Sequence, residues 1–275
     1  MRTLSLGLIG DNIRATRSGD LHRACGRLSG IEVSYELCIP RDLGQEFDAV
    51  FDGCVARLDG FNVTLPYKER AARRVRIDDP AVQRLGAVNT VLVTPDGPVG
   101  HNTDFTGFST AYRAAFGDRP PGRVALIGAG GVGRAIGFAL VDLGAADIVV
   151  IDSDPARAAA LAKALGPGAT TGAIHAVATA DGVVNATPLG MVGYGGCPVP
   201  DDIAFPPGAW AFDAVYTPPD TPFRTRALAA GADFLSGWEL FFHQGLDGFR
   251  LFSGQPVTDP DAVRAALSAP PASAA

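Results

Sequence analysis

The chain has 275 residues, which is long enough for one large domain or two domains of ordinary size. Hydrophobic residues make up 47% and charged residues 19%, so a substantial buried core is expected and global disorder is excluded. The formal net charge of -6 argues against a nucleic-acid-binding protein, because phosphate binding needs a clustered basic surface.

Strand and helix patterns alternate through the first hundred residues. In chain order they predict a strand at Leu4–Ile9, a helix at Gly19–Leu28 and strands at Ile31–Ile39, Phe61–Leu65, Ala87–Val93 and Val99–Asn102. The last two strands flank Pro95-Asp96-Gly97, a strong hairpin turn. An antiparallel hairpin within a βαβ series predicts a mixed sheet.

A helix at Phe105–Phe116 and the Gly- and Pro-rich run 117–122 separate this part from a second alternation. There the patterns predict strands at 123–127, 147–152, 182–186 and 209–216, with helices at 131–144 and 154–165 between them. Beyond 237 only helices are predicted, at Trp238–Phe252 and Pro260–Ser268, and the tail 269–275 is expected to be frayed.

These patterns predict a two-domain α/β protein. We expect an N-terminal substrate domain with a mixed sheet over residues 1–103 and a Rossmann-type parallel-sheet domain over 104–237. The helices of 238–275 are expected to return and pack on the first domain.

The four cysteines show no CxxC spacing and the four histidines no metal-ligand spacing. Reduced, mostly buried thiols and no metal site are therefore expected. The N-terminal apolar stretch contains Gly7, Gly10 and Asp11, which favours a strand over a signal peptide, and no uncharged apolar run approaches membrane-span length. We expect a cytoplasmic protein, monomeric or homodimeric, without membrane or nucleic-acid partners.

A glycine-rich loop, RVALIGAGGVG at 123–133, predicts a dinucleotide site. Gly128, Gly130 and Gly133 form G-x-G-x-x-G between an apolar strand and a helix pattern. In that context the loop bends tightly and lets the backbone approach a pyrophosphate, which the free N–H groups of the helix start bind. The residues expected to contact the cofactor here are Gly128, Ala129, Gly130, Gly131, Val132 and Gly133.

Asp152 ends the next strand, 19 residues after Gly133. A carboxylate at this place accepts hydrogen bonds from the ribose hydroxyls of NAD and repels a 2′-phosphate, so NAD is expected over NADP. Arg157 is the first base after it. Two interpretations of Arg157 stay open, a partner for a phosphate and a solvated helix residue.

Lys68 and Asp104 each follow the end of a predicted strand. The carboxyl ends of strands line the ligand crevice in open α/β sheets, so we expect these two charges to meet across the cleft between the domains, beside the glycine loop. Asn62, Thr64, Asn89 and Thr103 occupy similar positions and offer hydrogen bonds to a polyol.

Taken together, these residues and the motifs around them resemble the shikimate/quinate dehydrogenase family. The resemblance rests on blocks in the same order over most of the chain: NVTLPYK, GAVNTV, GHNTDFTGF, GAGGVGRAI, VVNATPLGM, DAVYTPPDTPF and HQGLDGFRLFSG. It implies that Lys68 and Asp104 are the catalytic pair, sharing the proton transfer that accompanies oxidation of a ring alcohol.

The resemblance also implies the remaining site residues. Substrate contacts are expected from Thr64, Asn89, Thr103, Tyr216 and Gln244, and cofactor-side contacts from Asn185, Thr187, Leu189, Met191, Val215 and Gly237. Where the family has an S-x-S-P turn for the substrate carboxylate, this chain has Thr16, Ser18 and Gly19. Capping of the next helix by the two hydroxyls is the alternative for that segment.

The implied activity is an NAD-preferring dehydrogenase that interconverts quinate or shikimate and the matching 3-dehydro ketone. Three alternatives stay open: an NADP-dependent biosynthetic shikimate dehydrogenase, an aminoshikimate or aminoquinate dehydrogenase suggested by the altered turn, and a ligand-binding relative without turnover.

Overall fold

The computed structural model describes residues 2–268, and the tail predicted to be frayed lies outside that range. The chain divides into two compact units. Unit 1 contains the chain up to Thr103 together with the chain from Gln244 onward, and unit 2 contains Asp104–His243. The functional domains predicted at 1–103, 104–237 and 238–275 stay a prediction.

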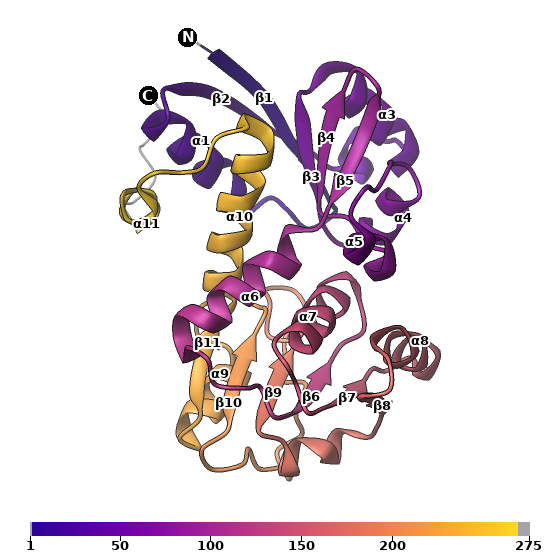
Figure 1. The fold of residues 1–275 in the computed structure, drawn as a ribbon, viewed down its shortest axis with the longest axis vertical. Coiled ribbons are helices and arrows are strands. Elements are labelled where there is room, and N and C mark those ends of the chain that lie inside the picture. The colour runs from indigo at the N-terminus through magenta and orange to yellow at the C-terminus, as the bar shows by residue number, and fades with distance from the viewer. Residues whose placement is uncertain (1, 269–275) are drawn as a thin grey trace. The chain divides into compact units, whose positions relative to one another are not determined.

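Unit 1 is built on a five-stranded mixed sheet with the order β2-β1-β3-β4-β5 (Figure 1). Its strands are β1 (Arg2–Ile9), β2 (Ile31–Cys38), β3 (Gly60–Val63), β4 (Thr90–Thr94) and β5 (Gly97–His101). β1 pairs in parallel with β2 and β3, whereas β3, β4 and β5 are antiparallel, so the predicted hairpin and mixed sheet are confirmed.

Helices cover this sheet and close its core. They are α1 (Ser18–Leu28), α2 (Pro40–Leu43), α3 (Phe47–Arg57), α4 (Lys68–Ala72) and α5 (Pro80–Leu85), followed late in the chain by α10 (Gly237–Ser253) and α11 (Pro260–Ser268). A Cβ on Gly245 of α10 would lie 2.5 Å from the side chain of Leu21, and α11 also contacts α1. The C-terminal helices therefore return to the first unit, as predicted.

Unit 2 contains an all-parallel six-stranded sheet with the order β11-β10-β9-β6-β7-β8 (Figure 1). Its strands are β6 (Arg123–Ile127), β7 (Asp147–Ile151), β8 (Ala169–Thr171), β9 (Gly182–Asn185), β10 (Trp210–Asp213) and β11 (Asp233–Ser236). Along the chain this is the 3-2-1-4-5-6 order of the Rossmann fold, and it confirms the predicted fold class.

The helices of unit 2 join the strands. They are α6 (Thr103–Phe116), which begins at the last residue of the preceding segment of unit 1, α7 (Gly131–Asp142), α8 (Pro155–Leu165), the 3₁₀ helix η1 (Ile174–Thr179) and α9 (Pro222–Ala229). The core contains apolar side chains from both sheet faces, with Trp210, Phe108, Phe212 and Phe223 fully buried.

Several elements were not predicted. In α3 the residues Phe47, Val50, Phe51 and Cys54 are buried at the spacing of a helix face, a pattern that was available in the sequence. The short strands β8 and β11 have few residues, so their patterns are weak. Among the described residues, no helix has both the length and the hydropathy that crossing a bilayer requires.

Candidate active site

Four parallel strands of unit 2 end at the same level of the sheet. Ile127 of β6 pairs with Ile151 of β7 and with Asn185 of β9, and Asn185 pairs with Asp213 of β10. The segments that follow these strands therefore share one edge. The strand order reverses between β6 and β9, and this switch point is where open α/β sheets bind ligands.

The glycine loop lies at this edge, and each of its three glycines meets a different constraint. Gly128 has a φ of 104°, in the region that favours glycine. A Cβ on Gly133 would lie 1.9 Å from the carbonyl oxygen of Gly128, so only glycine lets α7 approach the loop. Gly130 is the N-cap of α7, and a Cβ there would meet only the Arg157 guanidinium, at 3.6 Å.

This arrangement fits a dinucleotide pyrophosphate. A Cβ on Gly130 would overlap no backbone atom, and a helix N-terminus supplies N–H groups and a partial positive charge. Ala129, Gly131 and Val132 belong to the same loop and first helical turn. The Arg157 guanidinium adds a full positive charge beside Gly130.

Asp152 directly follows β7 and is half-buried. One carboxylate oxygen accepts a hydrogen bond of 2.7 Å from the N–H of Ala129, and the other accepts one of 2.9 Å from the N–H of Asp154. Asp152 therefore connects the glycine loop to the turn before α8. Its negative charge is fixed at the edge of the sheet.

Asn185 organises the segment that follows β9. Its side-chain oxygen accepts hydrogen bonds from the N–H and the hydroxyl of Thr187, at 3.0 and 2.7 Å, and its amide donates to the carbonyl of Leu189 at 3.2 Å. The amide also donates to Asp213 at 2.9 Å. Met191 follows in the same segment and is half-buried.

Asp213 is a buried carboxylate that the sequence analysis did not select, and only 1% of it is exposed. It accepts hydrogen bonds from Asn185, from the N–H of Val215 at 3.0 Å and from the hydroxyl of Thr221. Burial raises the pKa of Asp213 to about 6, against the opposing effect of these hydrogen bonds. Its position at a strand end, like that of Asp152, was a signal that could have identified it.

Beyond Val215 the predicted substrate residue Tyr216 lies in an aromatic group. Its ring stacks on Phe241 with centroids 4.9 Å apart, and Trp238 packs on both rings. A Cβ on Gly237 would lie 2.5 Å from the carbonyl oxygen of Asp213, so the start of α10 depends on glycine to approach β10.

In unit 1, Asn89 holds the segment that leads into α6. Its side-chain oxygen accepts a hydrogen bond of 2.8 Å from the N–H of Thr103, and its amide donates to the Thr103 hydroxyl at 3.0 Å. The Thr103 hydroxyl also lies 3.3 Å from the side-chain oxygen of Gln244 on α10. Three predicted substrate residues therefore form one polar group.

Lys68 is the first residue of α4 and only 6% exposed, and its carbonyl accepts the N–H of Val88 at 3.0 Å, next to Asn89. Asp104, the residue after Thr103, is 5% exposed. Thr64 follows β3 and donates its N–H to Ile9 at 2.9 Å. Both members of the predicted catalytic pair are buried, which is rare for charged side chains.

The hydroxyls of Thr16, which lies between β1 and α1, and Ser18, the first residue of α1, are 3.0 Å apart. Arg17 is the N-cap of α1 and its side chain makes no capping hydrogen bond, whereas the Thr16 hydroxyl accepts a hydrogen bond of 3.3 Å from the N–H of Ser18. Both interpretations of the two hydroxyls, capping of the helix and contact with a carboxylate, therefore stay predictions.

Asn62, named above for its position at a strand end, is held by three side chains that the sequence analysis missed, His22, Tyr35 and Thr90. Asn62 accepts hydrogen bonds from His22 at 3.2 Å and from the Tyr35 hydroxyl at 3.0 Å, and donates to Thr90 at 3.2 Å. Burial lowers the pKa of His22 to about 4, although the bond to Asn62 opposes this shift.

Known proteins that are similar to this chain identify its family. Residues 8–91 match the family described as shikimate dehydrogenase substrate binding domain, and residues 123–193 match the family described as NADP oxidoreductase coenzyme F420-dependent. A quinate/shikimate dehydrogenase (NAD(+)) of Corynebacterium efficiens is 37% identical over 95% of this chain and 96% of its own length. A shikimate dehydrogenase (NADP(+)) of Streptomyces avermitilis is 38% identical over 94% of this chain and 92% of its own length.

Two solved structures have the same fold over nearly the whole chain. A quinate dehydrogenase from Corynebacterium glutamicum in complex with NAD superposes with a TM-score of 0.87 at 32% identity, covering 98% of this chain and 100% of that one. A shikimate 5-dehydrogenase from Thermus thermophilus in complex with NADP(H) and shikimate has a TM-score of 0.84 at 32% identity, covering 96% and 98%. The chain belongs to the shikimate/quinate dehydrogenase family of oxidoreductases, which act on CH–OH groups.

Proposed function

We propose that this protein is an NAD-preferring dehydrogenase that interconverts quinate or shikimate and the corresponding 3-dehydro ketone. The relatives carry both NAD and NADP in their names, so they do not decide the cofactor. The observation that supports NAD is Asp152, whose carboxylate is anchored at the end of β7 by the Ala129 and Asp154 N–H groups.

An anchored carboxylate discriminates between the two cofactors by charge. A ribose with free hydroxyls can donate hydrogen bonds to Asp152, whereas a 2′-phosphate would bring a second negative charge to the same place. The Arg157 guanidinium lies 3.6 Å from a Cβ on Gly130, and we assign it to the pyrophosphate. Arg157 is also the observation that favours the second candidate, an NADP-dependent shikimate dehydrogenase.

We assign the binding of the substrate's carboxylate and ring hydroxyls to residues of unit 1. The hydroxyls of Thr16 and Ser18 lie 3.0 Å apart, which suits two donors to one carboxylate. The polar group of Asn89, Thr103 and Gln244, with Thr64, is assigned to the ring hydroxyls.

Lys68 and Asp104 are assigned to proton transfer. Burial of an ionic side chain costs free energy that its surroundings must compensate. Lys68 and Asp104 are both buried and both follow a predicted strand, which favours a functional role for them. When bound, the nicotinamide accepts or supplies the hydride at the ring carbon. In this proposal Lys68 removes the proton from the alcohol oxygen in oxidation or donates it to the carbonyl oxygen in reduction, and Asp104 shares this proton transfer.

The test is a comparison of kcat/KM for two substrates and two cofactors, quinate or shikimate with NAD or NADP. We expect turnover with at least one substrate and an NAD preference of tenfold or more, equivalent to about 1.4 kcal/mol. An equal or greater efficiency with NADP would support the second candidate. Cofactor binding without turnover in all four combinations would contradict both.

A further inference from the structure

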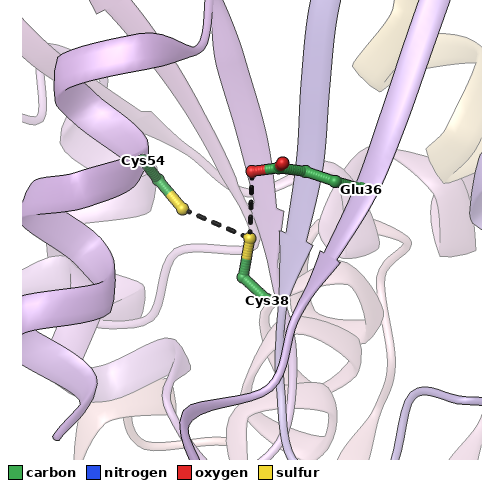
Figure 2. Close-up of side chains that lie close together, drawn as sticks. All are labelled: Glu36, Cys38 and Cys54. Carbon is green, nitrogen blue, oxygen red and sulfur yellow. Dashed lines mark hydrogen bonds between the residues drawn. The ribbon is translucent and has the colours of Figure 1, made fainter. Parts of the chain in front are cut away.

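A cluster of three potential metal ligands lies away from the residues assigned to the reaction. Glu36 and Cys38 are two positions apart on β2, so their side chains emerge on the same face of the sheet. Cys54 reaches them from α3. Figure 2 shows the three side chains converging, with the Cys38 sulfur between the other two ligand groups.

The distances in this cluster are close to those of a metal centre. The sulfurs of Cys38 and Cys54 are 3.5 Å apart, and the Cys38 sulfur is 3.3 Å from a Glu36 oxygen. All three ligand atoms lie within 4.8 Å of one another. Tetrahedral zinc with Zn–S bonds of about 2.3 Å separates two sulfurs by about 3.8 Å, and a sulfur and an oxygen by about 3.5 Å. The sulfur–sulfur and sulfur–oxygen distances would therefore need to lengthen by only a few tenths of an ångström to hold a tetrahedral zinc ion.

A disulfide is a poorer match for the same cysteines. An S–S bond of about 2.05 Å would require the two sulfurs to approach by roughly 1.5 Å. Both thiols are buried, Cys54 completely and Cys38 to all but 2%, and packed surroundings resist such a movement. The geometry therefore favours a bridging cation over a covalent bond.

The charges around the cluster also suit a dication. Arg57 forms an ion pair with Glu36. Two thiolates and one carboxylate carry three negative charges, which a dication and the Arg57 guanidinium together neutralise.

Glu36 is the solvent-accessible ligand of the three. The side chain of Glu36 is 42% exposed, whereas the sulfurs lie behind it in the interior. Gly7 on the neighbouring strand β1 leaves room for Glu36, because a Cβ at Gly7 would lie 3.3 Å from its Cγ. A carboxylate at the surface can bind a cation first and pass it to the thiols.

We propose that Glu36, Cys38 and Cys54 bind one thiophilic divalent cation of the zinc class. Two S–H bonds break and two metal–sulfur bonds form, both protons leave to solvent, and no oxidant or reductant is required. The carboxylate supplies the third ligand. The site is independent of the proposed dehydrogenase activity. It also revises the expectation of no metal site, which rested on sequence spacing alone.

The test uses the full chain, reduced and stripped of metal, titrated with Co²⁺ and then Zn²⁺. We expect one Co²⁺ per chain, a sulfur-to-cobalt charge-transfer band, loss of that band on adding Zn²⁺, and release of roughly two protons per cation. Cys38→Ala and Cys54→Ala should abolish the band, and Glu36→Gln should weaken Zn²⁺ binding at least tenfold. Cys25→Ala, which removes another buried thiol of unit 1, is the matched control and should bind normally.

A second measurement needs no variant. With Zn²⁺ bound, Cys38 and Cys54 should resist alkylation in the native chain while Cys197, which is partly exposed, reacts; peptide mass spectrometry identifies the protected thiols. The proposal is overturned if the reduced chain gives no charge-transfer band, if the band survives in both cysteine variants, or if Zn²⁺ does not change the labelling of Cys38 and Cys54.

Discussion

Lys68 is one of two lysines in the chain, and the other offers a direct comparison. Lys68 is buried, whereas Lys163 on α8 is exposed. A buried amine at the start of a helix retains its position only if its surroundings compensate for lost hydration. Replacing each lysine in turn therefore distinguishes a specific role of Lys68 in the reaction from a general effect of losing one positive charge.

We expect Lys68→Ala to lower kcat by about 10²–10⁴-fold with a much smaller change in KM, because proton transfer is lost while substrate contacts remain. Lys163→Ala should leave both constants unchanged. Steady-state kinetics with the better substrate and cofactor measures this. A Lys68→Ala enzyme with near-normal kcat would remove Lys68 from the mechanism.

The charge of Asp152 is expected to set the cofactor preference. Asp152→Asn keeps an oxygen that can accept the Ala129 N–H but removes the negative charge. The ratio of kcat/KM with NAD to that with NADP should fall by roughly tenfold or more, since repulsion of the 2′-phosphate is relieved.

The matched control for Asp152 is Asp154→Asn. Asp154 is an exposed acid that caps α8 through the Ala156 N–H, and asparagine caps helices equally well. This variant should leave the cofactor ratio unchanged. An equal change in both variants would mean that Asp152 does not select the cofactor.

Among the elements, the glycine loop between β6 and α7 contains one glycine needed for packing and another that we assign to cofactor binding. A Cβ on Gly133 would overlap the backbone of Gly128, whereas a Cβ on Gly130 would meet only the Arg157 guanidinium, at 3.6 Å. Two glycines three positions apart therefore serve different purposes. One lets the helix approach the loop, and we assign the other to the approach of the cofactor.

We expect Gly133→Ala to destabilise the protein by more than about 2 kcal/mol, because its methyl group would overlap the Gly128 carbonyl. Gly130→Ala should change stability by less than about 1 kcal/mol and weaken NAD binding at least tenfold. Urea unfolding and a fluorescence titration with reduced cofactor measure the two effects. Normal cofactor affinity in a folded Gly130→Ala protein would contradict the assignment.

At the scale of the whole molecule, the two units contain buried groups with opposite responses to acid. The pKa of His22 in unit 1 is about 4 when folded against 6.5 as the ordinary value, so stability is lost as the pH falls from about 6.5 to about 4. The pKa of Asp213 in unit 2 is raised to about 6, so its contribution is most favourable at low pH and is lost as the pH rises from about 4 to about 6. Each shift corresponds to about 3 kcal/mol.

We therefore expect acidification from pH 7 to pH 4.5 to weaken unit 1 before unit 2. Both tryptophans, Trp210 and Trp238, belong to unit 2, so their fluorescence follows that unit while far-ultraviolet circular dichroism follows both. At pH 4.5 the dichroism transition in urea should begin at a lower urea concentration than the fluorescence transition.

Two variants distinguish this account from general acid sensitivity. His22→Gln should reduce the separation of the transitions at pH 4.5, while His175→Gln, at an exposed histidine of unit 2, should leave it unchanged. Coincident transitions at both pH values in the unmodified protein would contradict the prediction.

The sequence predicted most of the fold, because its signals are local. The strands of both sheets that carry site residues were found from runs of apolar side chains, and the hairpin from Pro95-Asp96-Gly97. The helix α3 was overlooked although its pattern was present. The short strands β8 and β11 are defined by pairing with neighbours, which no local pattern contains.

By itself the sequence determined the glycine loop, the acid that follows it, the lysine and aspartate at strand ends, and the family. These signals depend on residue type and spacing along the chain. Only the tertiary structure decided that Cys38 and Cys54 lie 3.5 Å apart, that Asp213 is buried and bonded to Asn185, and that His22 binds Asn62. Such contacts join residues far apart in the chain, and their distances and burial depend on how whole elements pack.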